Sequence, residues 1–207
     1  MKDPTKAVIF DLGNVLIDFD HMIAAKKIAK FSDKEGKEIF DLFFDSELTN
    51  AFEEGKVSPQ DFFTKVKETL NLKISYDEFV RIWNAIFFLS NKNLRVYNLA
   101  YDLKSRCKVV VLSNINVLHY EHIKKTFPVF DAFHRVVASC ELGLRKPQRE
   151  IYQKTLQMLK VSPHDCFYTD DRPELVESAK SLGIRGFVFK NVEQLKKDLQ
   201  LFGISIN

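Results

Sequence analysis

Short apolar runs separated by amphipathic segments are the main pattern along this 207-residue chain. Strands buried on both faces of a parallel sheet are almost entirely apolar, because neither face meets water. Five runs have this composition, and they are AVIF (7–10), KVVVLS (108–113), RVVAS (135–139), CFYTD (166–170) and, less sharply, GFVF (186–189). We therefore expect these runs to be strands of one parallel sheet.

Segments with helical periodicity connect the later runs. They are Val117–Thr126, Pro147–Leu159 and Pro173–Leu182. The first turn of a helix accepts proline, and a glycine such as Gly183 commonly follows a helix end, so both features support these helices. Strand and helix alternate, and this predicts an open α/β sheet.

The interval 19–89 breaks the alternation, because it has helical periodicity and no buried strand. Ser58 has the sequence context of a helix N-cap, and Ser75 with Glu78 resembles a capping box. The sequence therefore predicts a helical module inserted after the first strand. The rest of the chain, residues 1–18 and 90–207, is the predicted core.

Composition narrows the functional classes. Hydrophobic residues make up 45% of the chain and charged residues 29%, which is typical of a soluble globular protein. No apolar run approaches the roughly 20 residues of a membrane span, and no signal-peptide pattern precedes the first strand. A net charge of +3 does not require a nucleic-acid partner. We expect a cytoplasmic monomer or homodimer that binds neither nucleic acid nor membrane.

Polar side chains gather where the predicted strands end. In open α/β sheets, ligands bind beyond the carboxyl ends of the strands, so side chains at these ends are expected to meet. The set holds three carboxylates, a hydroxyl, an amide and an ammonium group. Its members are Asp11, Ser113, Asn114, Lys146, Asp170 and Asp171. Their joint position favours a functional site over separate loop contacts.

These residue types fit phosphoryl transfer. Carboxylates suit a hard cation such as Mg²⁺, and an aspartate can attack phosphorus to form an aspartyl-phosphate. The cation offsets the repulsion between that carboxylate and a phosphate anion. Ser113 and backbone N–H groups can hydrogen-bond phosphoryl oxygens, and Lys146 supplies a positive charge. The set is therefore an electrostatic cradle for a transferred phosphoryl group.

The same segments carry a family resemblance. FDLGNV, VVLSN, GLRKP and FYTDD resemble, in order and spacing, the four motifs of the haloacid dehalogenase superfamily. More closely, FDLGNVLIDFD, VVLSNINVLH and LGLRKPQREIYQ resemble a bacterial subgroup of sugar-phosphate phosphatases that includes an α-glucose-1-phosphate phosphatase. The similarity runs from about Ala7 to Val188. It implies a Rossmann-like core with a helical cap, and a Mg²⁺-dependent phosphatase acting on a small phosphorylated metabolite such as a sugar phosphate.

The resemblance also implies roles for individual residues. Asp11 is the expected nucleophile, and Lys146 is expected to assist catalysis. The expected metal ligands are Asp11, Asp171 and the backbone carbonyl of Gly13, and Asp170 is expected either to bind the metal directly or to support a ligand. The expected phosphate-binding groups belong to Ser113, Asn114, Lys146 and, through backbone N–H groups, Leu12 and Asn14. The cap segment 43–52 and Trp83 are expected to shape substrate choice.

Gly13 departs from the family pattern. Most phosphatases of the superfamily have a second Asp at this position, which protonates the leaving oxygen and then activates water. Metal binding is expected to persist, because the position supplies a backbone oxygen, whereas a positioned acid/base contributes about 10²–10⁴-fold to the rate. Asp18 and His119 are candidates for this proton transfer, although a loop contact for Asp18 and a helix-surface position for His119 are simpler explanations.

Three interpretations of Gly13 stay open. The chain can be a phosphatase with a substitute acid or a good leaving group, such as a sugar 1-phosphate. It can be a 2-haloacid dehalogenase, which needs no second acid, but such enzymes use no metal, and the Asp170–Asp171 pair would then have no purpose. It can also be a catalytically weak or inactive relative that binds a phosphorylated ligand.

Overall fold

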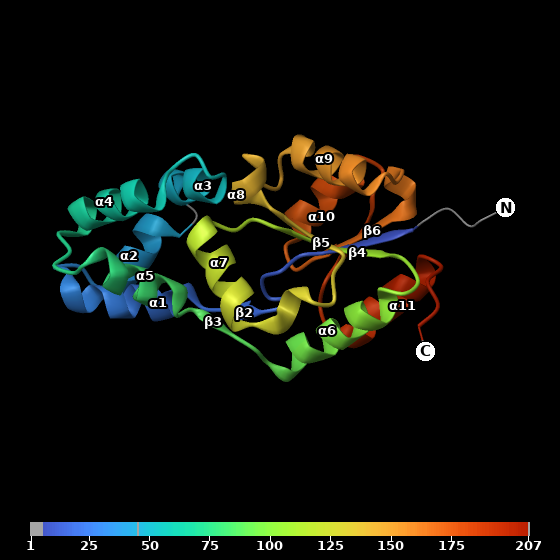
Figure 1. Ribbon diagram of the computed structural model, residues 1–207, viewed down its shortest axis with the longest axis horizontal. Helices are drawn as coiled ribbons and strands as arrows, with labels where there is room; N and C mark the ends of the chain where they lie inside the picture. Colours follow the sequence, from blue (N-terminus) through green and yellow to red (C-terminus); the bar gives the residue numbers. More distant parts are fainter. Residues whose placement is uncertain (1–5, 45, 207) are drawn as a thin grey trace.

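The computed structural model describes residues 6–44 and 46–206 (Figure 1). Its larger sheet has five parallel strands in the order β5-β4-β1-β6-β7. The strands are β1 (Ala7–Phe10), β4 (Lys108–Ser113), β5 (Arg135–Ala138), β6 (Cys166–Asp170) and β7 (Arg185–Val188). The predicted parallel sheet is therefore confirmed, with the first strand of the chain at its centre.

Helices cover both faces of this sheet (Figure 1). Val8 and Phe10 of β1 pack into one core cluster, and Ala7 and Ile9 pack into the other, because side chains alternate along a strand. The first cluster lies under α6 (Asn91–Leu103), α7 (Val117–Thr126) and α11 (Val192–Leu201). The second lies under α9 (Arg149–Leu159) and α10 (Pro173–Lys180). Because the strands are parallel, the carboxyl ends of β1, β4 and β6 meet at one edge of the sheet.

Helix α9 starts later than the sequence predicts. Pro147 precedes the helix, whose first residue is Arg149. A turn in which the N–H of Gln148 donates to the carbonyl of Arg145 occupies the segment where the helix was expected. The predicted start at Pro147 is therefore wrong, whereas Pro173 does open α10 as predicted.

Helices α1 to α5 form a separate group at the left of Figure 1. Two short antiparallel strands, β2 (Asp18–Phe19) and β3 (Phe87–Phe88), connect this group to the rest of the chain. The helices are α1 (His21–Ile28), α2 (Gly36–Phe43), α3 (Glu47–Glu53), α4 (Pro59–Leu70) and α5 (Tyr76–Asn84). This is the inserted helical cap, so the predicted fold class is confirmed. The division at residues 18/19 and 89/90 stays a prediction, and residues 1–5, 45 and 207 of the predicted domains lie outside the described residues.

Local signals in the cap act as the sequence predicts. The hydroxyls of Ser58 and Ser75 accept hydrogen bonds from the N–H groups of Asp61 and Glu78, and each serine caps the helix that follows. Aromatic rings then fill the interior of the cap. The cap has its own hydrophobic core, since Phe52, Phe62, Phe79 and Trp83 are buried in one cluster with aliphatic side chains.

The cap also touches the core at a second place, where α3 approaches α8 (Ser139–Leu142). The hydroxyl of Ser139 donates to the carbonyl of Glu53 at 2.6 Å. A Cβ atom added to Gly55, which has φ of +66°, would lie 2.3 Å from the carbonyl oxygen of Cys140. Only glycine allows so close an approach of the two backbones. The cap therefore lies against the sheet edge in a closed arrangement.

No helix within residues 6–44 and 46–206 has the length and apolar character that crossing a lipid bilayer demands.

Candidate active site

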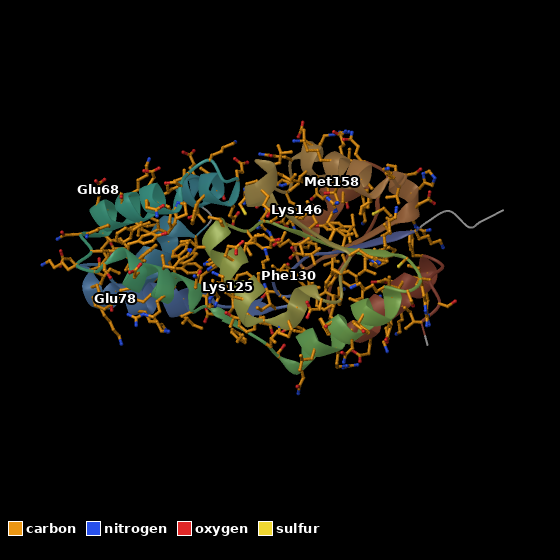
Figure 2. The ribbon with its side chains drawn as sticks, in the orientation of Figure 1. Glu68, Glu78, Lys125, Phe130, Lys146 and Met158 are labelled. Carbon is orange, nitrogen blue, oxygen red and sulfur yellow. The ribbon has the colours of Figure 1, made fainter. Side chains whose placement is uncertain are left out.

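Lys146 lies at the centre of the charged cluster, between the cap and the helices that cover the sheet (Figure 2). Asp11 directly follows β1, and Asp170 is the last residue of the neighbouring strand β6. The ammonium nitrogen of Lys146 is 2.7 Å from Oδ1 of Asp11 and 2.6 Å from Oδ2 of Asp170. Parallel register thus places two carboxylates side by side, and one almost fully buried cation joins them.

Asn114 holds the backbone of Lys146 in place. Its side-chain nitrogen donates to the carbonyl of Lys146 at 2.8 Å, and its side-chain oxygen accepts from the N–H of Lys146 at 2.7 Å. Both ends of the amide are therefore engaged in positioning the lysine. Asn114 also lines the cavity described below, and its phosphate-binding role stays a prediction. Ser113 precedes it at the end of β4 and lines the cavity described below.

Asp11, Asp170 and Asp171 each offer an oxygen atom, and these atoms lie within 4.8 Å of one another. Asp170 accepts further hydrogen bonds from the hydroxyl of Tyr168 and, at 2.9 Å, from the N–H of Arg172. These contacts fix the carboxylate at the sheet edge. Three oxygen ligands at this spacing suit a hard divalent cation.

The turn after β1 supports the third carboxylate. The side-chain nitrogen of Asn14 donates to Oδ2 of Asp171 at 3.0 Å, and Asn14 itself has φ of 56°, which Asn adopts more readily than most residues. Its backbone N–H donates to the carbonyl of Ile17 at 2.7 Å. The structure therefore uses that N–H within the turn, and it does not leave it to face a phosphate as the sequence analysis expected.

Burial sets the protonation of this cluster. Burial raises the pKa of Asp11 to about 7, against the opposing effect of Lys146, and the charges on Asp170 and Asp171 add to the rise. For Asp170, burial acts in the same direction, but Lys146 and Tyr168 hold its pKa below the ordinary value. Three carboxylates beside one ammonium group leave an excess of negative charge in a largely buried place. A bound cation would relieve that excess.

Gly13 lies against the ring of Phe19. A Cβ atom added to Gly13 would be 2.6 Å from Cε1 of Phe19. The ring is in turn packed against Phe87 of β3 and His21 of α1, with ring centroids 6.3 and 4.8 Å away. The space in which a side chain at position 13 would begin is therefore filled by an aromatic ring.

Asp18 is engaged at the connection between cap and core. Its carboxylate accepts from Nζ of Lys92 at 2.5 Å, from the hydroxyl of Ser90 at 2.7 Å and from the amide of Asn93 at 3.2 Å. Although burial acts to raise its pKa, the hydrogen bonds from Lys92 and its neighbours hold the pKa below the ordinary value. Among the described residues, Asp18 is not part of the cavity wall.

His119 is also engaged through both ring nitrogens. Nδ1 lies 3.0 Å from the side-chain nitrogen of Asn116, which donates to it, so Nε2 carries the proton and donates to the carbonyl of Trp83 at 3.1 Å. Burial lowers the pKa of His119 to about 3. The neutral ring is thus part of the packing between α7 and α5, and both of its nitrogens are already engaged in hydrogen bonds within the protein.

A cavity of about 410 Å³ lies between the sheet edge and the cap. Its core side includes Asp11, Ser113, Asn114, Lys146 and Asp171, whereas Asp170 is not part of the lining, and Arg145 extends this side. Phe44, Thr49 and Asn50 of the predicted cap segment 43–52 line the cavity, and so does Trp83. Phe43 and Phe52 of the same segment face the cap interior. Asp45 lies outside the described residues.

Sequence reasoning missed several residues of the wall, and they are Phe19, His21, Phe40, Glu53, Phe87 and Arg145. His21, Phe40 and Glu53 belong to ordinary amphipathic helices, where a residue facing a cavity has the same periodicity as one facing a core. Phe19 and Phe87 belong to the short strands β2 and β3, and Arg145 lies outside the helices and strands. The reach of Glu53 to Arg145, 3.3 Å between Oε2 and the guanidinium, depends on the closed cap. Only the three-dimensional arrangement identifies these residues.

Residues 5–183 match the family described as haloacid dehalogenase-like hydrolase. Because this match covers most of the chain, the chain belongs to that family, and the predicted family and hydrolase class are confirmed. It is 24% identical over 200 residues to the D-ribitol-5-phosphate phosphatase of Bacteroides thetaiotaomicron, covering 94% of this chain and 96% of that protein. It is 26% identical over 184 residues to a sesquiterpene phosphatase of Aspergillus oryzae, covering 87% and 88%.

Solved structures have the same architecture. A haloacid dehalogenase family enzyme from Bacteroides thetaiotaomicron, crystallised with magnesium and inorganic phosphate, superposes with a TM-score of 0.79 at 26% identity, over 91% of this chain and 96% of that one. The L-2-haloacid dehalogenase RSc1362 superposes with a TM-score of 0.64 at 17% identity, over 87% and 84%. The second likeness shows the fold alone.

Proposed function

We propose that this chain is a Mg²⁺-dependent phosphatase that acts through an aspartyl-phosphate on Asp11. The observation that carries the proposal is the meeting of three carboxylates within 4.8 Å, next to the ammonium group of Lys146. Two similar proteins are named as phosphatases, and a similar structure contains magnesium and phosphate, which supports the same activity. A small phosphorylated metabolite is the proposed substrate.

The chemistry follows from the residues present. The carboxylate of Asp11 attacks phosphorus, the P–O bond to the alcohol breaks, and the alcohol oxygen takes up a proton as it leaves. Water then attacks the phosphorus of the aspartyl-phosphate, which releases phosphate and restores Asp11. Mg²⁺ held by Asp11, Asp170, Asp171 and the carbonyl of Gly13 would supply positive charge against the repulsion between two anions.

Lys146 and Ser113 complete the proposed cradle. The ammonium group of Lys146 already touches the attacking carboxylate, and it can turn its remaining N–H toward a phosphoryl oxygen without leaving the cluster. The hydroxyl of Ser113 lines the same cavity. Fixed donors in a site that excludes water stabilise the charge of the transition state more than donors in water do.

A catalytically weak phosphate-binding protein is the second candidate. The observation that favours it is the ring of Phe19 in the place of an acidic side chain at position 13. Proton transfer to the leaving oxygen then depends on water or on the intrinsic acidity of the alcohol. A dehalogenase is less favoured, because the cluster of Asp11, Asp170 and Asp171 would have no role.

A panel of phosphate monoesters tests the proposal. Wild-type protein should release phosphate with Mg²⁺ and stop when EDTA is added, and Asp11→Asn should lose the activity. Asp131→Asn, the same change at a solvent-exposed position, is the matched control and should keep it. Release of halide from 2-haloacids without metal would instead support the dehalogenase. Phosphate binding without turnover of any ester, p-nitrophenyl phosphate included, would support the binding protein. The cytoplasmic location and the monomeric or homodimeric state stay predictions.

A further inference from the structure

Aromatic rings stacked on one another line the cap side of the cavity. The rings of His21 and Phe44 have centroids 4.2 Å apart and planes 26° apart, and Phe44 and Trp83 are 5.9 Å and 10° apart. His119 continues the arrangement, 5.4 Å and 15° from Trp83. Four cavity-lining rings from separate elements thus share nearly one orientation. His21 and Phe44 are only half-buried, so part of their surface is left for a ligand.

Polar atoms without partners occur in the same wall. Nδ1 of His21, Nε1 of Trp83 and Nε of Arg145 are buried, and none has a hydrogen-bond partner among residues 6–44 and 46–206. All three residues line the cavity. Buried polar groups in folded proteins nearly always have a partner, so three exceptions around one cavity point to a partner that arrives with a ligand.

We propose that the substrate is a phosphate monoester whose alcohol carries a planar heteroaromatic ring, and that this ring packs against the exposed parts of His21 and Phe44. This inference rests on the proposed phosphatase function. A planar ring matches faces of common orientation through stacking, and polar atoms at its edge supply partners for the unpaired nitrogens. A cavity of about 410 Å³ is within the usual size of a small-molecule site, roughly 300–1,000 Å³.

Other alcohols can make only one of the two kinds of interaction that this wall offers, apolar contact or hydrogen bonds. An isoprenoid chain covers apolar surface but offers no hydrogen bond to the nitrogens of His21 and Trp83. A bare polyol offers hydrogen bonds but leaves the aromatic faces without a matching surface. The side chain of His21 is suited to stacking as a neutral ring, because burial lowers its pKa to about 4. The wall as a whole therefore favours a ring with polar edges.

Flavin mononucleotide and ribitol 5-phosphate isolate the effect of the ring. Both carry the phosphate on the terminal hydroxyl of a ribityl chain, and only the first carries a heteroaromatic ring. Pyridoxal 5′-phosphate adds a smaller ring, and farnesyl phosphate adds an apolar chain. With Mg²⁺ present, we expect kcat/KM for at least one ring ester to exceed the values for ribitol 5-phosphate and farnesyl phosphate by about tenfold or more, the size of effect expected from two stacking contacts. Equal or lower values for both ring esters would overturn the inference.

A variant pair tests the stacking face. Phe44→Leu keeps an apolar side chain of similar size but removes the ring, and it should lower kcat/KM for the preferred ring ester about threefold to tenfold, mainly through KM. Phe63→Leu makes the same change in the same cap, away from the cavity, where the ring packs against Tyr76 and Phe79. It should leave the preference for ring esters unchanged. An equal loss in both variants would contradict a specific stacking role for Phe44.

Binding to Asp11→Asn separates this inference from the proposed function. The flavin ring loses fluorescence when it stacks on aromatic side chains, so titration with this variant should quench flavin mononucleotide, and adding Phe44→Leu should weaken the binding. Quenching without turnover by the wild type would sink the phosphatase proposal and keep the ring site. Turnover of p-nitrophenyl phosphate without quenching, and without a preference for ring esters, would keep the phosphatase proposal and overturn the ring site.

Discussion

The two ends of the cavity treat buried polar groups in opposite ways. At the sheet edge, each charged group contacts another, since Lys146 joins Asp11 and Asp170, and Asn14 supports Asp171. At the cap wall, the rings of His21 and Trp83 are neutral and keep a nitrogen without a partner within the described chain. The first end has its carboxylates held by hydrogen bonds but keeps an excess of negative charge, and the second end keeps neutral nitrogens without partners.

This difference suggests that one end carries out phosphoryl transfer and that the other selects the alcohol of the substrate. In the proposed function, the charged end offers fixed donors and acceptors for any phosphate ester, so it would determine the chemistry and not the identity of the alcohol. The aromatic end contributes nothing to phosphorus chemistry, but its shape and unpaired nitrogens favour some alcohols over others. Changes at the first end should therefore affect all substrates alike, and changes at the second should alter their ranking.

The largest effect is expected from Lys146→Met, which breaks the charged end. Removing the cation leaves two buried carboxylates without their partner, and such a loss typically costs about 3–5 kcal/mol of the free energy of unfolding. Turnover of every ester should fall together, by about 10²–10³-fold, as when a donor to the transition state is lost. Urea unfolding and phosphate release measure the two effects.

The metal provides a further check on this variant. Added Mg²⁺ should restore part of the lost stability of Lys146→Met, because a bound cation compensates the same carboxylates. Lys154→Met, at an exposed position of α9, should change neither quantity. Lys146→Met should also leave the order of preference among the phosphate esters unchanged. If instead the variant altered which ester is preferred, the separation of the two ends would be wrong.

The second largest effect concerns the boundary between the ends, where Phe19 fills the space beside Gly13. Gly13→Asp alone should destabilise the protein by about 1–3 kcal/mol, because the new side chain begins 2.6 Å from the ring. Gly13→Asp with Phe19→Ala has room for the carboxyl group. Its kcat/KM for alkyl phosphates should exceed that of Phe19→Ala by about 10²-fold, since an acid now protonates the leaving oxygen.

Gly13→Asn with Phe19→Ala is the matched control, because it has the same size without a titratable group. The gain should appear only with Asp and should be smaller for aryl phosphates, whose leaving oxygens need less protonation. An equal gain with Asn would show that the space, and not the acid, is what matters. A gain from Gly13→Asp alone would contradict the steric role of Phe19.

The sheet and the charged end could be predicted because local sequence determines them. Apolar runs mark buried strands, and the parallel arrangement brings Asp11 and Asp170 to one edge without any knowledge of side-chain rotamers. The contact that holds Lys146 in place was harder to predict. The side chain of Asn114 makes two hydrogen bonds to the backbone of Lys146. That contact joins residues 32 positions apart, and no local pattern signals it.

The aromatic end could not be predicted for the converse reason. Phe43 and Phe44 are neighbours in sequence, yet the first packs inside the cap and the second lines the cavity. Helical periodicity distinguishes a buried face from an exposed one, but it does not distinguish a face buried by protein from one that borders a cavity. The position of Phe19 against Gly13 likewise depends on the pairing of β2 with β3.

A third, smaller effect tests whether the aromatic end is neutral. Burial lowers the pKa of His21 to about 4 and that of His119 to about 3, both below the value of about 6.5 in an unfolded chain. The unfolded state therefore binds more protons than the folded state below pH 6.5, and stability falls as the pH falls from 7 to 5. Each histidine should account for about 2 kcal/mol of the loss at pH 5.

Urea unfolding at pH 7 and pH 5 measures this loss. His21→Gln and His119→Gln should each reduce the difference between the two pH values by about 2 kcal/mol, whatever their effect at pH 7. His164→Gln, at an exposed position outside the cavity, is the matched control for the loss of a histidine. If either cavity variant kept the full pH dependence, its histidine would be charged in the folded state and the wall would not be a neutral stacking face.

The smallest effect is expected at Asp18, which belongs to neither end. Its carboxylate is bound by Lys92, Ser90 and Asn93 where the cap joins the core, so Asp18→Asn should lower the free energy of unfolding by about 1 kcal/mol and leave single-turnover rates within about threefold. Were Asp18 the missing proton donor, the rate would fall by about 10²–10⁴-fold for alkyl phosphates. Rapid-quench measurement of phosphate release distinguishes these outcomes. A large loss confined to poor leaving groups would show that Asp18 is the acid, at the connection between cap and core. The division of roles between the charged end and the aromatic end would then be incomplete.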